Sequence, residues 1–116
     1  MSNASFRLEH LNLPARDPQG LANWYAQTFG LRADGQKVRA DGVLIVFQTG
    51  EPLARAPEIH FGLRLSSMKE LTAWAEKFHA KITTGGEYNA FRTSDPEGNC
   101  IELYCSPDAR APRGEL

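Results

Sequence analysis

Two of the three histidines in this chain, His10 and His60, lie fifty residues apart, and so do its two tryptophans, Trp24 and Trp74. Histidine and tryptophan are rare residues, so two coincidences at one offset indicate that one structural unit is used twice. Each unit then carries a histidine at the same place. Imidazole nitrogens bind divalent transition metals, so the repeat supplies two matched candidate ligands for one metal site.

Glu102 is the third candidate ligand. It lies in a segment, residues 100–105, where polar and apolar side chains alternate. Alternation with period two predicts a strand, and Glu102 then shares a face with Cys100 and Tyr104. Two imidazoles and one carboxylate suit Fe(II), Mn(II), Zn(II), Ni(II) or Co(II), and they leave positions open for a substrate. The sequence therefore predicts that His10, His60 and Glu102 bind one divalent metal ion.

Each of these residues also has a plainer interpretation. A single histidine on a half-buried strand is more often structural than a ligand, and Glu102 alone could be a surface residue. The repeat places Val46 where the counterpart of Glu102 would stand, so we expect only three protein ligands. Gln48 and Cys100 are weaker candidates for a further ligand, and Cys100 could also be a nucleophile.

Three more side chains are candidates for the same cavity, namely Arg64, Arg92 and Tyr104. An arginine would favour a carboxylate or phosphonate substrate, and a tyrosine could donate a proton. Arg92 and Tyr104 are the candidate catalytic residues. His79 falls at the end of a predicted helix, where a favourable interaction with the helix dipole is a sufficient explanation.

Each copy of the unit is predicted to open with a strand that is followed by a helix. Alternating patterns predict strands at residues 6–13 and 58–65. Asp17, followed by proline, predicts the start of the first helix, and Gly30 predicts its end. A capping box that begins at Ser67 predicts the start of the second helix.

Shorter strands follow each helix and are separated by turn signals. They are predicted at residues 43–48 in the first copy and at 88–93 and 100–105 in the second. The order in each copy is a strand, a helix and then two or three antiparallel strands. The predicted fold class is α+β, with both helices on the outer, apolar side of a sheet and the three candidate ligands on the opposite face.

The length of 116 residues predicts a single domain, which we place at residues 6–106. Within and around it we expect a tag or disordered segment at 1–5, modules at 6–50 and 57–106, and a tail at 107–116.

Charge and cysteine usage narrow the class of protein. The net charge is −1 and the basic residues are dispersed, which argues against a nucleic acid or an anionic membrane as partner. There is no apolar run of about 18 residues that could span a bilayer.

Cys100 and Cys105 would lie roughly 16 Å apart along a strand, too far for a disulfide. Unpaired thiols fit the reducing cytoplasm, which is the expected location.

Taken together, the chain resembles the vicinal oxygen chelate superfamily, which contains glyoxalase I, bleomycin-resistance proteins, fosfomycin-resistance thiol transferases and extradiol dioxygenases. The resemblance covers residues 6–106 and is more specific for the fold than for the reaction. It is carried by His10-Leu11-Asn12-Leu13 through Asp17, Trp24-Tyr25 and Phe29-Gly30-Leu31, by Ile59-His60-Phe61-Gly62-Leu63, and by Asp95-Pro96-Glu97-Gly98-Asn99-Cys100-Ile101-Glu102-Leu103.

The resemblance implies two βαβββ modules that form a cupped mixed β-sheet around a divalent metal ion. The family's ligand positions fall on His10, His60 and Glu102. It also implies a homodimer whose sites are shared between subunits, and a small-molecule substrate. In this family the substrate chelates the metal through adjacent oxygens, and the metal stabilises an enediolate, an oxyanion or a related intermediate.

Two departures from the family pattern narrow the reaction. Val46 stands where glyoxalase I enzymes carry an acidic or amide ligand, which argues against methylglyoxal detoxification. Arg92 stands where thiol transferases and ring-cleaving dioxygenases tend to carry a tyrosine. The sequence thus predicts a divalent-metal-dependent enzyme for a small oxygenated substrate, acting as a lyase, isomerase, transferase or dioxygenase. The alternative is a metal-free protein of the same fold that sequesters a small molecule or an antibiotic.

Overall fold

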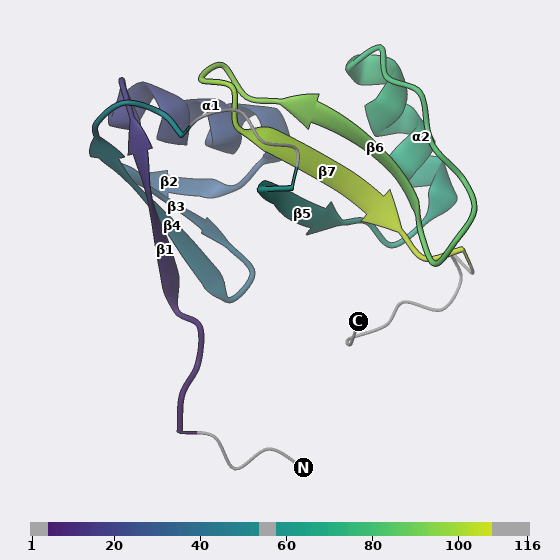
Figure 1. Ribbon diagram of the computed structural model, residues 1–116, viewed down its shortest axis with the longest axis horizontal. Helices are drawn as coiled ribbons and strands as arrows, with labels where there is room; N and C mark the ends of the chain where they lie inside the picture. Colours follow the sequence, from purple (N-terminus) through teal and green to yellow (C-terminus); the bar gives the residue numbers. More distant parts are fainter. Residues whose placement is uncertain (1–4, 54–57, 108–116) are drawn as a thin grey trace. The chain divides into compact units, whose positions relative to one another are not determined.

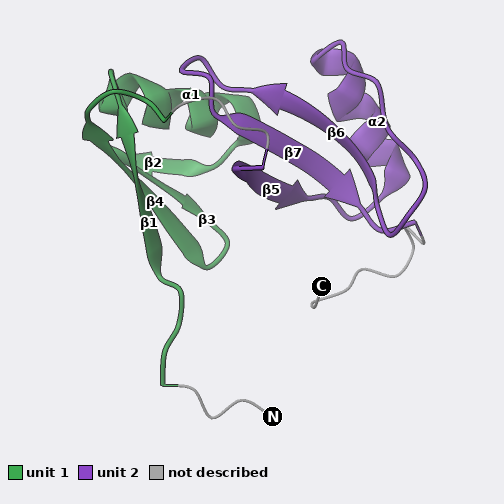
Figure 2. Cartoon of the chain, in the orientation of Figure 1, with its two compact units in different colours: residues 1–54 green, residues 55–116 purple. Residues whose placement is uncertain are grey.

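A computed structural model of the protein describes residues 5–53 and 58–107 (Figure 1). The chain forms two compact units, residues 1–54 and 55–116 (Figure 2). Nearly all of the expected tag and tail, and the start of the second predicted module, lie outside the described residues. The elements are β1 (His10–Ala15), α1 (Pro18–Phe29), β2 (Arg32–Asp34), β3 (Lys37–Ala40), β4 (Val43–Thr49), β5 (His60–Arg64), α2 (Met68–Lys77), β6 (Asn89–Ser94) and β7 (Cys100–Cys105).

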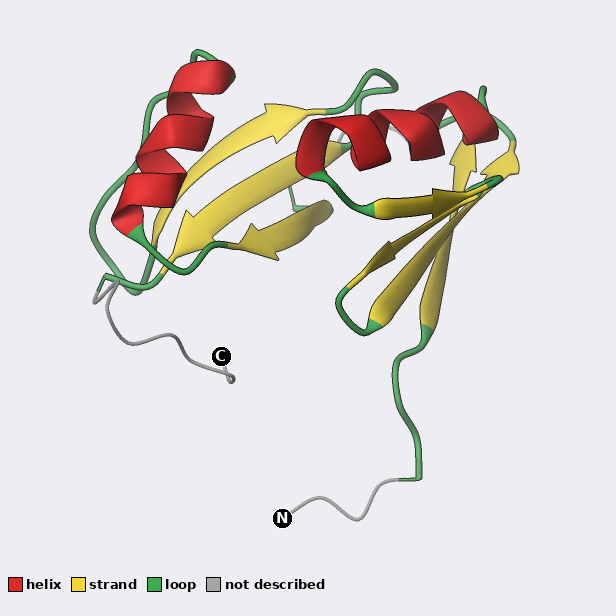
Figure 3. Ribbon diagram, turned by 180° about the vertical axis from the view of Figure 1, so that it is seen from behind, coloured by secondary structure: helices red, strands yellow, loops and turns green. Residues whose placement is uncertain are grey.

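The first unit is a four-stranded mixed sheet with one helix on one face. The strand order is β1-β4-β3-β2, with β1 parallel to β4 and the other pairs antiparallel. Helix α1 lies along the sheet (Figure 3) and contacts all four strands. Tyr25 of α1 stacks on Phe47 of β4 with ring centroids 5.9 Å apart, and both side chains are buried. Burying a side chain of this size stabilises the fold by roughly 1.5–3 kcal/mol.

The second unit repeats this plan with a smaller sheet. The strand order is β5-β7-β6, with β5 parallel to β7 and β6 antiparallel to it. Helix α2 packs on β6 and β7 through buried Leu71 and Ala75, opposite Phe91, Ile101 and Leu103. Where the first unit has a further strand, the described residues hold only an isolated bridge between Thr83 and Ala90. The predicted α+β class with two related modules is confirmed.

The ends of both helices agree with the sequence. The Asp17 side chain accepts a hydrogen bond from the Gly20 amide (3.1 Å), and Gly30 closes α1 in the left-handed conformation (φ 73°). Ser67 Oγ accepts from the Glu70 amide (3.1 Å) at the start of α2. The Glu70 carboxylate contacts the hydroxyl of Ser66 (2.6 Å) as well as that of Ser67. These caps satisfy amides that have no partner within the helix.

The first predicted strand was placed too early. β1 begins at His10 rather than at residue 6, because its ladder partner β4 begins at Val43 and Leu44 is the residue that pairs with His10. The Glu9 carbonyl still accepts a hydrogen bond from the Leu44 amide (2.9 Å), and the residues before Glu9 lie beyond the start of β4. The side chains of Phe6 and Leu8 are therefore 90% and 72% exposed. No helix within residues 5–53 and 58–107 is long and apolar enough to cross a membrane.

Candidate functional site

The second unit places Glu102 in the middle of its sheet, on the face opposite α2. Along β7 the side chains alternate between buried Ile101 and Leu103 and the half-buried Cys100, Glu102 and Tyr104. This is the face assignment that the alternating sequence predicted. Glu102 pairs in register with Gly62 of β5 on one side and with Arg92 of β6 on the other.

The two oxygens of the Glu102 carboxylate have different partners. Oε1 lies 3.6 Å from Nε2 of His60, and Oε2 lies 3.3 Å from Nε of Arg92. The side chains of His60 and Glu102 are 25% and 26% exposed, so this contact is largely shielded from solvent. The structure thus brings together two of the three predicted metal ligands and one predicted catalytic residue.

The turn between β6 and β7 fixes the pairing of Arg92 with Glu102. Asp95 is buried, and its carboxylate accepts hydrogen bonds from the Glu97 amide (2.9 Å), the Asn99 amide (3.0 Å) and the Asn99 side chain (2.8 Å). These bonds close the turn so that Ser94, the last residue of β6, pairs with Cys100, the first residue of β7. Two residues further along, Arg92 and Glu102 are cross-strand neighbours.

His10 belongs to the first unit. Its Nδ1 lies 2.7 Å from Oε1 of Glu9, and its side chain is half exposed. The hydrogen bond with His10, followed by the charge of His10 and those of Arg39 and Lys37, lowers the pKa of Glu9. The side-chain oxygen Oε1 of Gln48 accepts a hydrogen bond from Nδ2 of Asn12 (2.5 Å), so this side chain already has a partner within its own unit.

The donor atoms of His60 and Glu102 suit a divalent cation. Ligands at metal distances of about 2.0–2.2 Å lie roughly 3.0–3.5 Å from one another in tetrahedral or octahedral sites. The observed 3.6 Å between Nε2 and Oε1 is close to this spacing. Within residues 5–53 and 58–107, however, no group of three or more His, Cys, Asp or Glu side chains is near enough to hold a metal ion. His60 and Glu102 therefore form a two-donor pair within the second unit, and His10 belongs to the first unit.

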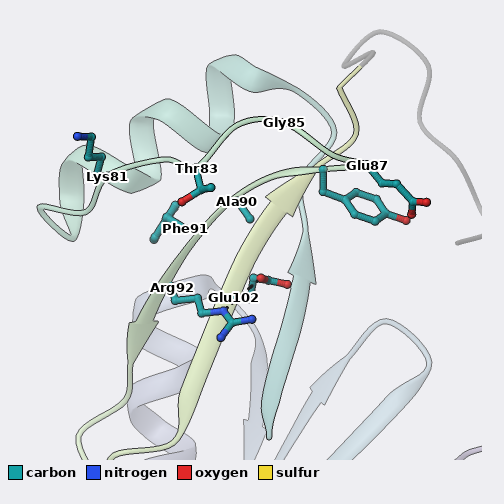
Figure 4. Close-up of a pocket in the computed structure, with 9 residues that line it drawn as sticks. Lys81, Thr83, Gly85, Glu87, Ala90, Phe91, Arg92 and Glu102 are labelled. Carbon is teal, nitrogen blue, oxygen red and sulfur yellow. Dashed lines mark hydrogen bonds and ion pairs between the residues drawn. The ribbon is translucent and has the colours of Figure 1, made fainter. Parts of the chain in front are cut away.

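A hollow of about 550 Å³ lies beside Glu102 along β6 (Figure 4). Glu102 and Arg92 border one part of it, and their side chains lie next to each other in the figure. The segment that leads into β6 supplies the rest of its polar lining, with Lys81, Thr83 and Glu87. These three residues were not predicted, because they belong to a loop with no periodic pattern.

Tyr104 shares the face of Glu102 but is not among the residues that line this hollow. Its ring lies over Gly62, where an added Cβ would come within 3.3 Å of Cε1, and it meets Tyr88 edge-on at 5.1 Å. Burial raises the pKa of Tyr104, and the charge of Arg64 opposes that effect. The phenol is therefore protonated at neutral pH and can act as a donor. Arg64, which pairs with Tyr104 in the ladder, is likewise absent from the hollow's lining.

The cysteines and the third histidine lie apart from the Glu102 carboxylate contacts. Cys100 is half-buried, Cys105 is buried, and neither forms a disulfide. Burial raises the pKa of the Cys105 thiol. His79 follows α2 in the left-handed conformation (φ 54°), and its amide donates to the Glu76 carbonyl at the helix end. The backbone of His79 thus closes the end of the helix, and the dipole contact of its side chain stays a prediction.

Comparisons with known proteins agree on the fold. The sequence model of the Glyoxalase/Bleomycin resistance protein/Dioxygenase superfamily matches residues 7–103. Similar solved structures include the oxidase ChaP-H2, with a TM-score of 0.67 and 16% identity over 90% of this chain and 96% of that one. A possible glyoxalase from Bacillus cereus has a TM-score of 0.66 and 20% identity over 87% of this chain and 100% of that one.

A lactoylglutathione lyase from Agrobacterium tumefaciens has a TM-score of 0.59 and 18% identity over 90% of this chain and 96% of that one. At these identities the likeness shows the fold alone. No curated protein matches the chain in sequence.

Proposed function

The chain belongs to the Glyoxalase/Bleomycin resistance protein/Dioxygenase superfamily, and on that basis we propose that it is a divalent-metal-dependent enzyme for a small oxygenated substrate. The metal ligands would be His10, His60 and Glu102. The observation that carries this proposal is the 3.6 Å approach of His60 Nε2 to Glu102 Oε1 on adjacent strands. The reaction would be that of a lyase, isomerase, transferase or dioxygenase.

A bound divalent cation would supply Lewis-acid chemistry to the oxygens of the substrate. The residues of the chain have separate tasks. His60 offers a nitrogen lone pair when neutral, and Glu102 offers Oε1 while Arg92 holds Oε2 at 3.3 Å. Arg92 also borders the hollow, where its guanidinium would attract a carboxylate or phosphonate group. Tyr104, whose pKa burial raises further above neutral pH, would donate a proton.

We further propose a homodimer in which each site is shared between subunits. Strands β1 and β5, which carry His10 and His60, are edge strands of their own sheets. The exposed apolar side chains Phe6, Leu8 and Ile59 lie close to these strands in sequence. Unpaired edges and exposed apolar residues are typical of surfaces that assembly buries.

The two unpaired thiols support the proposal of a reducing, cytoplasmic location.

The test of metal dependence is elemental analysis of the purified full chain together with a competitive zinc-binding titration. Wild type is expected to hold close to one divalent ion per chain. His60→Ala and Glu102→Ala should each lose most of it, because two donors seldom retain a metal that needs three. His79→Asn is the matched control, since asparagine tolerates the left-handed backbone there. Equal metal content in wild type and both site variants would remove this assignment.

A metal-free binding protein is the second candidate, and one observation favours it. Arg92 already neutralises Glu102 across the sheet, so the carboxylate has a cationic partner without any metal. The hollow beside the pair is large enough for a small ligand. Purified protein that neither contains nor takes up a divalent ion, yet binds a small molecule tightly, would support this role.

A further inference from the structure

Arg92 and the proposed metal ion would compete for one carboxylate. Glu102 Oε2 accepts a hydrogen bond from Arg92 Nε at 3.3 Å, while Oε1 lies 3.6 Å from His60 Nε2. The two partners come from strands on opposite sides of β7, and the register places Arg92 directly across from Glu102. A cationic side chain thus lies beside the carboxylate that would bind a divalent cation.

Arg92 could act on a metal ion at Glu102 in two ways, which differ in sign. A hydrogen bond to a ligating carboxylate orients it and strengthens metal binding. A positive charge close to the metal repels it and weakens binding. Orientation requires only a hydrogen-bond donor, which a neutral side chain would also supply. Glu102 is in addition held by its strand, because its neighbours Ile101 and Leu103 are buried on the other face.

The repulsion is expected to be the larger of the two effects. A metal about 2.0–2.2 Å from Oε1 would lie roughly 6 Å from a guanidinium that is bonded to Oε2. Even with the dielectric constant of water, one charge acting on a divalent ion across this distance changes its affinity by about tenfold. Arg92 should therefore lower the affinity of Glu102 for a metal ion.

The hollow beside Glu102 offers a way to relieve this repulsion. The side chain of Arg92 is 47% exposed and borders the hollow of about 550 Å³ (Figure 4). The charged residues of its lining are two cations and two carboxylates, namely Lys81, Arg92, Glu87 and Glu102, so their formal charges cancel. A divalent ion bound to Glu102 would make this lining positive, and an anion in the hollow would offset that charge.

We propose that Arg92 couples metal binding at Glu102 to anion binding in the hollow, an inference that rests on the proposed metal site. Arg92 competes with the metal for Glu102 when no anion is bound. A carboxylate in the hollow draws the guanidinium towards itself and leaves both oxygens of Glu102 to the metal. Each ligand then raises the affinity of the other by the same factor, because coupling between two binding sites is reciprocal. Arg92 is in this respect a positioning residue that acts through Glu102.

The first test compares the zinc affinity of full-length variants in a competitive titration without added carboxylate. Arg92→Gln removes the charge and keeps a donor, so it should bind zinc about tenfold more tightly than wild type. Arg92→Lys keeps the charge and should stay within about threefold of wild type. Lys69→Gln is the control and should not change the affinity, since Lys69 is exposed on α2, on the other face of the sheet.

The second test repeats the titration with acetate at constant ionic strength, and with acetamide as the neutral control. Acetate should tighten zinc binding by wild type at least about threefold more than it does for Arg92→Gln, and acetamide should have no effect. Acetate that merely coordinates zinc would act equally on both proteins, so the difference between them is the measure of coupling. In metal-free wild type, acetate should also shift the NMR signal of the Arg92 Nε–H group.

The outcomes separate this inference from the proposed metal site. Equal or weaker zinc binding by Arg92→Gln would overturn the coupling, and so would an acetate effect of the same size in both proteins. If zinc binding is nevertheless lost in His60→Ala, the metal site stands without the coupling. Failure of both wild type and Arg92→Gln to bind zinc would remove the metal site and this inference together.

Discussion

Replacement of Asp95 should loosen the turn that sets the candidate site. Its buried carboxylate accepts three hydrogen bonds of 2.8–3.0 Å within the turn. Hydrogen bonds to a charged group contribute about 1.5–3 kcal/mol each, but the released amides would recover part of this from water. We therefore expect Asp95→Ala to lower the free energy of unfolding by about 3 kcal/mol. For a chain of this length, that is a fall in Tm of roughly 12 °C.

An isosteric exchange separates the hydrogen bonds from the volume of the side chain. In Asp95→Asn the new amide would face the Asn99 amide, which now donates to Asp95 Oδ2. The Asn99 amide would have to turn over to present its oxygen, and the charge of the acceptor would be lost, so we expect a loss of about 1.5–2 kcal/mol. Adding Asn99→Asp restores a donor facing an acceptor, so the double variant should recover at least half of that loss.

Urea unfolding followed by tryptophan fluorescence measures these differences, with constant m-values as the check that only stability has changed. A cost below about 1 kcal/mol for Asp95→Ala would refute the view that this carboxylate holds the turn. Absence of rescue by Asn99→Asp would refute the assigned pairing.

Three further predictions concern stability. His79→Gly should raise the free energy of unfolding by about 0.5–1 kcal/mol in urea titrations, because His79 has φ 54° and glycine adopts this conformation without steric cost. Burial raises the pKa of Tyr104 in the folded state above its ordinary 10.0. The folded state therefore holds this proton more tightly, so stability should fall as pH rises from about 10, and Tyr104→Phe should show a smaller fall between pH 9 and 11. Arg32→Thr removes repulsion from Arg39 and should stabilise the chain by about 0.2–1 kcal/mol in thermal unfolding, whereas Arg16→Thr should have no measurable effect.

The parts of the fold that the sequence predicted well are those fixed by local chemistry. The caps at Asp17, Gly30 and Ser67 depend on residues within one turn of the helix end, so a short segment suffices to identify them. The start of β1 was wrong because a strand extends only as far as its partner does. The partner, β4, is more than thirty residues away, and residues 6–9 carry no mark of where it begins.

The candidate site likewise has one feature that the local sequence predicts and one that it does not. Alternation along β7 predicted that Glu102 faces away from α2, since the two faces of a strand differ in burial. The contact of His60 with Glu102 depends on the parallel pairing of β5 with β7, for which no turn sets the register. From the sequence, the only reasons to expect His60 to contact Glu102 were that both lie on the face away from the helices and that the chain contains an internal repeat.

The two charged cross-strand pairs, by contrast, could have been found from the sequence, because each lies two residues out from a hairpin turn. The turn that follows Asp34 sets Asp34 opposite Lys37, so Arg32 must oppose Arg39. The turn at Asp95 sets Ser94 opposite Cys100, and the same count brings Arg92 to Glu102. One pair combines opposite charges beside a hollow, and the other combines like charges on an open face. Opposite charges satisfy each other without a ligand, whereas like charges do not. The charge of Arg39 acts instead on the carboxylate of Glu9, whose pKa it helps to lower, so this pair is offset by a residue outside its own hairpin.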